Sequence, residues 1–353
     1  MSARITINGR FLTRPATGVD RFAIELLRCW LPAYAATLSA RIVVPRNASR
    51  CDAGQLPTAQ PVGALGGHGW EQLELPVYCR DDMLLNLCNT GPMAHRSQLA
   101  VLHDVGALAN PSSYGYSFRT WYRLLFTGLM RRARIIATVS NFSASELMRC
   151  FGSRAGRIEV IPESGEHILR VAADPNVLGR LDLRGRPYVL CVGSQAPHKN
   201  FGAVARAAAL LDDPDMRIVA VGGANSRVFA QAAPAAARLV RTGHVTDGEL
   251  RALYENAQCF VFPSLYEGFG LPPLEAMHCG CPTIVSRRAA LPEVCGDGAS
   301  YCDPDDPSDI ATQLRRVLSS SSLRSELRER GLLRAKAFSW QAAAQQLQHI
   351  LGR

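Results

Sequence analysis

The sequence predicts an α/β protein with two parallel-sheet domains and a ligand site in the cleft between them. Three observations carry this prediction. The chain has 353 residues, which suffices for two domains of about 100–200 residues each. Short apolar segments alternate with longer amphipathic stretches along the whole chain, a pattern that favours parallel strands joined by helices. A polar stretch broken by glycines, 162–186, separates the halves and is typical of a linker.

The alternating segments define an expected order of strands and helices. In the first half we expect strands at 5–8, 42–45, 84–87, 100–103, 135–139 and 158–161. In the second half we expect strands at 188–192, 218–221, 259–262 and 283–285. Helical periodicity is found at 21–31, 118–132, 203–211, 247–256, 273–278, 308–318 and 340–351. The interval 47–69 is rich in glycine and proline and is expected to be a long loop.

Charge and composition narrow the possible partners. The net charge is +9, and Lys199 and Lys336 are the only lysines among 39 basic residues. A positive surface suits phosphate-bearing ligands or anionic lipids. The sequence has no zinc-finger spacing, no aromatic RNA-binding pattern and no dense basic tail, so no nucleic-acid partner is expected. No apolar run approaches the roughly 18 residues of a membrane span, and no apolar signal region opens the chain, so we expect a cytoplasmic protein.

Ligands of open parallel sheets bind beyond the carboxyl ends of the strands, so chemistry is expected in the loops there. The strongest candidate follows the strand that ends at Phe262. A loop with two glycines leads to a helix that begins near Pro272 or Pro273. Loop N–H groups and the helix N-terminus form an anion site suited to a diphosphate. Glu267 and Glu275 are expected to accept hydrogen bonds from sugar hydroxyls, although helix capping and surface exposure are the structural alternatives.

Three further candidates follow other predicted strands. Lys199 lies in the loop after the strand 188–192, and its compact ammonium suits a phosphate. His103 and Asp104 lie at the carboxyl end of the strand 100–103, where a functional role for the histidine is favoured and a structural role for the aspartate. Gly18 opens a helix after the first strand, which lets the backbone approach a phosphate closely.

The stretch from Glu267 to Glu275 resembles the E-x7-E signature of the retaining glycosyltransferases of family 4, and the resemblance extends over nearly the whole chain. It implies the GT-B fold, in which two Rossmann-like parallel-sheet domains face a cleft. It also implies an N-terminal acceptor-side domain, 1–168, and a C-terminal nucleotide-sugar-binding domain, 169–353. In relatives the last helix crosses back to the first domain, so 340–353 would pack there.

The resemblance also implies roles for the residues of this signature. Glu267 would contact hydroxyls of the donor sugar, and Glu275 would hold the ribose. The backbone N–H groups of Phe269, Gly270 and Leu271 would bind the sugar and the phosphates.

Other positions resemble the family's motifs less completely. Lys199 would bind the donor diphosphate, and Ser194 occupies the donor-binding position where many members carry arginine. His103 would reach the donor sugar and the reacting centre. Gly18 belongs to the N-terminal glycine loop, whose first glycine is replaced here. Val245 lies in a segment that resembles the one beside the nucleotide base.

Together these implications predict a retaining hexosyltransferase that uses His103, Glu267 and Lys199 in catalysis. The donor would be GDP-mannose or UDP-glucose, with mannose favoured, and the acceptor a hydroxyl of a glycan or polyprenol-linked oligosaccharide in surface polysaccharide synthesis. No Asp-x-Asp motif follows a predicted strand, so neither a metal nor another cofactor is expected. Two alternatives remain: a sugar-nucleotide epimerase, and a catalytically weak paralogue that serves as a sugar-nucleotide-binding or scaffold subunit.

The stretch 119–134 mixes aromatic and leucine side chains with five arginines. It could rest on an anionic membrane and make a peripheral contact on the inner face. The favoured alternative is an ordinary amphipathic helix whose apolar stripe faces the domain core.

Overall fold

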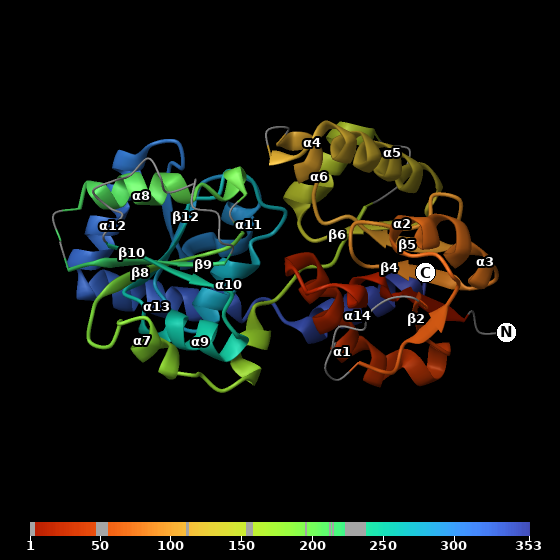
Figure 1. The fold of residues 1–353 in the computed structure, drawn as a ribbon, viewed down its shortest axis with the longest axis horizontal. Coiled ribbons are helices and arrows are strands. Elements are labelled where there is room, and N and C mark those ends of the chain that lie inside the picture. The colour runs from red at the N-terminus through yellow and green to blue at the C-terminus, as the bar shows by residue number, and fades with distance from the viewer. Residues whose placement is uncertain are drawn as a thin grey trace. The chain divides into compact units, whose positions relative to one another are not determined.

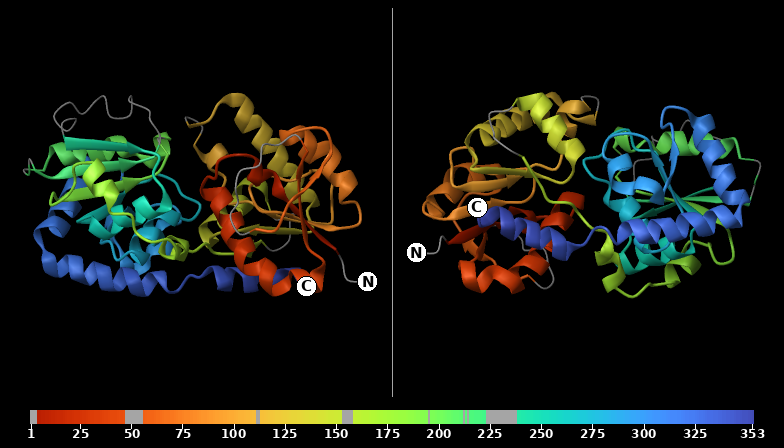
Figure 2. Two further views of the ribbon diagram at one scale, coloured as in Figure 1. Left: turned by 60° about the horizontal axis from the view of Figure 1, so that its bottom comes forward. Right: turned by 180° about the vertical axis from the view of Figure 1, so that it is seen from behind.

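The computed structural model describes residues 4–46, 56–110, 113–152, 158–194, 196–211, 213, 215–222 and 238–353. The chain forms two compact units. Unit 1 holds Met1–Glu163 and Trp340–Arg353, and unit 2 holds Ser164–Ser339. Each unit has one sheet with helices around it (Figures 1 and 2). The predicted α/β fold with two parallel sheets is therefore confirmed.

The sheet of unit 1 has the strand order β3-β2-β1-β4-β5-β6-β7, and all its neighbouring strands run parallel. Every residue of β1, β4 and β5 is buried, because helices cover both faces of a parallel sheet. The strands are β1 (Ile5–Asn8), β2 (Arg41–Pro45), β3 (Gln60–Val62), β4 (Met83–Asn86), β5 (Gln98–Val101), β6 (Ile135–Thr138) and β7 (Glu159–Val160).

The helices of unit 1 lie on both faces of this sheet, with α1 and α14 together on one face and α5 on the other (Figures 1 and 2). Trp30 of α1 and Trp340 of α14 are fully buried, and Trp30 Nε1 donates to Gln348 Oε1 at 3.2 Å. The helices are η1 (Gly9–Thr13), α1 (Gly18–Leu38), α2 (Gly67–Gly69), η2 (Trp70–Glu74), α3 (Leu75–Tyr78), α4 (Gly106–Ala109), α5 (Tyr116–Arg132), α6 (Asn141–Phe151) and α14 (Trp340–Leu351).

The sheet of unit 2 has the order β10-β9-β8-β11-β12-β13 and is also parallel throughout. Its core packs apolar side chains of β8, β11 and β12 against α8 and α12. The strands are β8 (Tyr188–Val192), β9 (Arg217–Val221), β10 (Leu239–Gly243), β11 (Cys259–Phe262), β12 (Thr283–Ser286) and β13 (Ser300–Cys302). The helices are η5 (Glu166–Arg170), α7 (Asn176–Arg180), η6 (Pro197–Lys199), α8 (Phe201–Ala209), α9 (Asp247–Asn256), α10 (Leu271–His278), α11 (Leu291–Cys295), η9 (Gly296–Gly298), α12 (Pro307–Ser319) and α13 (Ser321–Ala335).

Most expected elements agree with the structure within a few residues, and β1, β8 and β11 have the expected bounds. The sequence analysis did not anticipate β3, β10, β13 or α13. The expected loop at 47–69 is wrong in its second part, because this part contains β3 and α2; residues 47–55 lie outside the described residues.

The division between the units falls after Glu163 rather than after residue 168. The reason is that η5, which spans the expected boundary, packs against α9 and α10 of unit 2. The last helix, α14, groups with unit 1 through its contact with α1.

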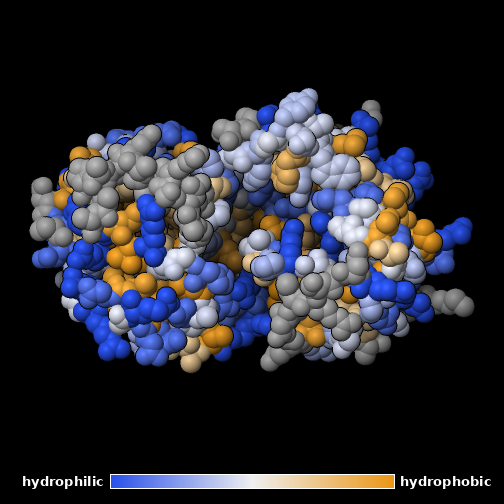
Figure 3. Space-filling model, viewed as in Figure 1, coloured by the Kyte–Doolittle hydropathy of each residue, from blue (hydrophilic) through white to orange (hydrophobic). Residues whose placement is uncertain are grey.

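The surface of unit 1 carries several exposed apolar side chains. Figure 3 shows hydrophobic side chains over the stretch from α2 to α3, where Leu73 of η2 and Val77 of α3 are 67% and 73% exposed. On α5, Leu125, Phe126, Leu129 and Met130 are buried, so an apolar stripe of this helix faces the core of the unit. None of the described helices is both long and apolar enough to cross a membrane.

Candidate active site

Two loops of unit 2 lie side by side at the carboxyl ends of β8 and β11, which are paired parallel strands. The loop after β8 contains 193–200, and the loop after β11 contains 263–270. Leu265 N donates to His198 O at 2.7 Å, and Asn200 Nδ2 donates to Pro263 O at 3.2 Å. These hydrogen bonds join the two loops, so residues far apart in the sequence form one site.

Lys199 and Glu267 form an ion pair across these loops. Lys199 Nζ donates to both carboxylate oxygens of Glu267, at 2.7 and 2.9 Å. The ammonium also lies 5.3 Å from the ring centre of Phe262. The two side chains are 17% and 11% exposed, so the pair is mostly shielded from water but open on one side. The structure thus brings together two of the predicted site residues.

The N-terminus of α10 presents free backbone donors beside this pair. Gly270 precedes the helix with a φ of 113°, a left-handed conformation that favours glycine. Within the described part of the chain, the N–H groups of Phe269, Gly270 and Leu271 donate to no acceptor. Prolines 272 and 273 have no N–H group. The first turn of α10 therefore has few N–H donors, but these donors are available to a ligand. The positive end of the helix dipole lies at the same place.

Glu275 lies within α10 and is buried, with 7% of its surface exposed. His167 Nε2 lies 3.0 Å from Glu275 Oε1, and Tyr254 OH donates to Glu275 Oε2 at 3.1 Å. Burial and the charge of Glu275 raise the pKa of Tyr254 well above 10, so the phenol keeps its proton and stays a donor. Sequence reasoning missed His167 and Tyr254, because no local pattern connects them to a glutamate on another helix.

The remaining donor-site predictions concern Ser194 and Val245. Ser194 is exposed just beyond β8, and Val245 is buried between β10 and α9. The donor-binding roles of Ser194 and Val245 stay predictions.

His103 follows β5 in unit 1 and is 3% exposed. Its Nε2 lies 2.9 Å from Leu87 O and must carry a proton, because a carbonyl oxygen only accepts. Its Nδ1 lies 3.2 Å from Glu163 Oε1. Burial lowers the pKa of His103, but the hydrogen bond and charge of Glu163, with the carbonyl, outweigh burial and raise it above 6.5. Glu163 is a third functional candidate that the sequence did not predict, and the catalytic role of His103 stays a prediction.

The loop around Gly18 is held by local hydrogen bonds. Thr17 N and Thr17 Oγ1 both donate to Asp20 Oδ2, at 2.9 and 2.6 Å. A Cβ atom at Gly18 would have no neighbour within 4 Å, so the backbone there is open to a ligand. Asp104 Oδ1 accepts from Gly106 N at 2.6 Å, a local hydrogen bond that forms a turn just before α4, which is a structural role.

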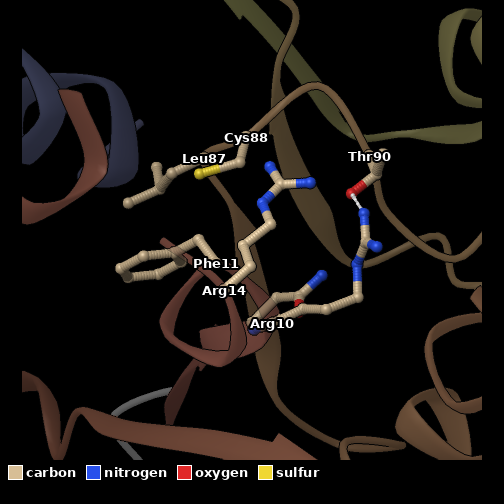
Figure 4. Close-up of a pocket in the computed structure, with 7 residues that line it drawn as sticks. Arg10, Phe11, Arg14, Leu87, Cys88 and Thr90 are labelled. Atoms are coloured by element: carbon tan, nitrogen blue, oxygen red, sulfur yellow. Dashed lines mark hydrogen bonds between the residues drawn. The ribbon is translucent and has the colours of Figure 1, made fainter. Parts of the chain in front are cut away.

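A hollow in unit 1 lies next to this loop (Figure 4). It has about 220 Å³ of empty space, part of it open to solvent. Its lining residues are Asn8, Arg10, Phe11, Arg14, Leu87, Cys88 and Thr90. Two of the seven lining residues are arginines, and each is paired with a carboxylate, Arg10 with Glu71 and Arg14 with Asp20.

Comparison with known proteins places this site in a family. The profile described as "Glycosyl transferases group 1" matches residues 180–334, all within unit 2. The chain is 35% identical over 262 residues to O-antigen chain mannosyltransferase B of Escherichia coli, covering 70% of this chain and 69% of that protein. It is 27% identical over 226 residues to the O-antigen chain mannosyltransferase RfbU of Salmonella typhimurium, covering 63% and 61%.

A solved structure extends the likeness to the whole fold. HepE of Anabaena, in complex with UDP and glucose, superposes with a TM-score of 0.75 at 16% identity, over 99% of both chains. Two parallel-sheet units with this overall likeness define the GT-B fold, and the profile match together with the 35% identical relative makes the protein a glycosyltransferase. Within that class, the chain belongs to the group 1 glycosyl transferase family and is similar to bacterial mannosyltransferases.

Proposed function

We propose that this enzyme transfers a mannosyl residue from GDP-mannose to a hydroxyl group of a glycan or polyprenol-linked oligosaccharide, with retention of anomeric configuration. The observation that carries the proposal is the Lys199–Glu267 pair beside the open N–H groups of α10. A sugar nucleotide needs a cation and N–H donors for its diphosphate and a carboxylate for its sugar hydroxyls, and this site offers all three.

In this mechanism the acceptor hydroxyl attacks from the face that the diphosphate leaves, and the leaving phosphate takes the proton of the acceptor. Lys199 and the N–H groups of Phe269, Gly270 and Leu271 stabilise the charge that develops on the diphosphate. Glu267 exchanges its bond to Lys199 for hydroxyls of the donor sugar. Glu275 accepts hydrogen bonds from the ribose.

The choice of donor is supported by the relatives. Two of them are named as mannosyltransferases of O-antigen chains, which favours a mannosyl donor and a polysaccharide acceptor. HepE was solved with UDP and glucose, which makes UDP-glucose the second candidate. A cytoplasmic enzyme with peripheral membrane contact through α5 would meet a polyprenol-linked acceptor.

A thermal-shift and hydrolysis screen tests the donor. The purified protein is incubated with GDP-mannose, UDP-glucose and UDP-N-acetylglucosamine, beside Glu267→Gln and the control Glu326→Gln. Glu326 is 47% exposed on α13 and pairs with Arg330, so its loss changes a surface carboxylate only. We expect GDP-mannose to raise the melting temperature of the wild type and of the control, and slow hydrolysis to disappear in Glu267→Gln.

Three results would contradict this proposal. Folded protein that responds to no sugar nucleotide would remove the donor assignment and favour a scaffold subunit. A β-linked product from an α-configured donor, detected by NMR of the glycoside, would remove the retaining mechanism. Rearrangement of the donor sugar without an acceptor would identify an epimerase.

A further inference from the structure

We propose that Arg10 and Arg14 form a binding site for a phosphate group carried by the acceptor. This inference rests on the proposed function, because it assigns the acceptor a chemical class. Both arginines line the same hollow of unit 1 and project into it side by side (Figure 4). Guanidinium groups match the oxygens of a phosphate with paired N–H donors.

Arg10 is held in position by a buried polar network. Its Nε donates to Glu71 Oε1 at 3.2 Å, and its Nη2 donates to Thr90 Oγ1 at 2.8 Å. Glu71 is fully buried and also accepts from Asn8 Nδ2 at 2.8 Å. These bonds use two of the five N–H donors of the guanidinium and leave the Nη1 donors without an acceptor in the described residues. A fixed guanidinium loses little entropy when it binds a ligand.

Arg14 forms the outer wall of the hollow. Its Nη2 donates to Asp20 Oδ1 at 2.8 Å, and the side chain is 45% exposed while Asp20 is fully buried. The carboxylate therefore anchors the arginine from inside, and only one of the five N–H donors of Arg14 is used in this bond. The arrangement repeats that of Arg10, with a buried carboxylate behind each guanidinium.

Charge effects on neighbouring side chains show that the two arginines act on one place. Burial and, next, the charge of Asp20 raise the pKa of the Cys88 thiol well above its usual value, while the charges of Arg14 and Arg10 both lower it. Both also lower the pKa of Tyr122 on α5, again against a larger effect of burial. The ring of Tyr122 stacks on Phe118 with centroids 4.3 Å apart. An aromatic pair beside two cations suits a sugar ring that carries a phosphate.

Calorimetric titration of the full chain with inorganic phosphate tests this site. The protein is first saturated with GDP, so that the proposed donor site is filled and cannot bind the phosphate. The titration is then repeated with the Lys199→Gln variant, in which the donor site is impaired. We expect Arg14→Gln to weaken phosphate binding about tenfold or more, since charge-assisted bonds are lost. Arg10→Lys keeps the positive charge but loses the paired N–H donors of the guanidinium, so we expect a smaller loss of phosphate affinity than in Arg14→Gln. The control Arg149→Gln, which removes a surface arginine paired with Glu146, should bind phosphate as the wild type does.

Two outcomes would overturn the inference. One is wild-type affinity for phosphate in both folded variants, and the other is no phosphate binding by a wild type that does bind a sugar nucleotide. Failure of the proposed function is distinguishable from these outcomes. In that case the protein binds no sugar nucleotide, whether or not it binds inorganic phosphate.

Competition identifies the source of the phosphate. Displacement of phosphate by detergent-dispersed undecaprenyl phosphate supports a lipid-linked acceptor, and displacement by glucose 1-phosphate supports a soluble one. Displacement by neither contradicts an acceptor site.

Discussion

At the scale of single residues, the two carboxylates of the E-x7-E signature have different surroundings. Glu267 is paired with a flexible lysine that can exchange it for a ligand. Glu275 is held on both oxygens by buried groups, His167 and Tyr254. A carboxylate oxygen has a second lone pair, so a ribose hydroxyl can still bind to Glu275. The held carboxylate is then already oriented, which lowers the entropic cost of binding the nucleotide.

Removing one of these supports should weaken donor binding. Tyr254→Phe deletes the hydrogen bond to Glu275 Oε2, and bonds to charged groups contribute about 1.5–3 kcal/mol. We expect the unfolding free energy to fall by that amount and the donor KM to rise about tenfold, with kcat changed less. Steady-state kinetics and urea unfolding measure both effects.

A matched control separates positioning from general stability. Tyr188 OH donates to Leu253 O at 2.7 Å and is equally buried. Tyr188→Phe should cost about 0.5–1.5 kcal/mol of stability and leave the donor KM unchanged. An equal rise of KM in both variants would argue against a positioning role of Tyr254.

The His103–Glu163 pair should make stability depend on pH. The folded-state pKa of His103 is raised above 6.5, so the stabilisation from the pair is complete below pH 6.5 and is lost as pH rises through the raised value. Urea unfolding between pH 5.5 and 9 compares the wild type with Glu163→Gln. We expect the stability difference between them to shrink as pH rises. A difference that is constant or grows with pH would be inconsistent with a charged pair.

At the scale of elements, η5 is packed tightly against α10. A Cβ atom at Gly165 would lie 2.5 Å from Glu275 N and 2.6 Å from Leu274 C. Backbone atoms cannot move aside as side chains can, so only glycine allows this approach. The contact places the segment that begins unit 2 directly on the helix of the candidate donor site.

Gly165→Ala should therefore displace α10 or η5. We expect a loss of about 1–3 kcal/mol from overpacking, together with weaker donor binding because Glu275 moves. Gly18→Ala is the control for stability, since a Cβ atom there meets nothing within 4 Å, and a change within about 0.5 kcal/mol is expected. Thermal unfolding of both variants gives the comparison, and equal losses would contradict the packing argument.

The three strands that the sequence failed to predict share a physical cause, which does not extend to the missed helix α13. The strands β3, β10 and β13 all lie at the edges of their sheets. An edge strand is covered less than a central one and tolerates polar residues or proline, as in Gln60-Pro61-Val62 of β3. Central strands must be apolar, which is why β1, β8 and β11 could be recognised from their sequences.

The sequence predicts part of the candidate site for the same reason, the position of residues relative to central strands. Lys199, Glu267 and Gly270 follow central strands. Functional residues of parallel sheets lie in the loops beyond the carboxyl ends of the strands. His167, Tyr254 and Glu163 were missed because each acts through a partner that tertiary folding brings near. His167 and Glu275 are 108 positions apart, and no periodicity relates them.

At the scale of the whole molecule, the missed strand β13 bears on the predicted absence of a metal. It is followed by Asp303-Pro304-Asp305, an Asp-x-Asp sequence, and Pro304 O accepts from Asn200 Nδ2 of the candidate site at 2.7 Å. The carboxylates already have partners: Asp305 pairs with Arg288, and Asp303 Oδ1 accepts from Asp305 N at 3.0 Å. These partners would have to be released before both carboxylates could bind a cation.

We therefore still expect transfer activity to persist in excess EDTA, because in the proposed mechanism Lys199 and the N–H groups of α10 neutralise the leaving diphosphate. If they carry this charge, Lys199→Met should lower kcat about 10²–10³-fold. Lys336→Met, which changes the only other lysine of the chain, should leave kcat unaltered. Complete loss of activity in EDTA that manganese restores would instead assign the charge to a metal, and Asp303→Asn and Asp305→Asn would then abolish the rescue. If the wild type remains active in EDTA and the Lys199→Met variant is inactive, then Lys199 is the main cation of the site.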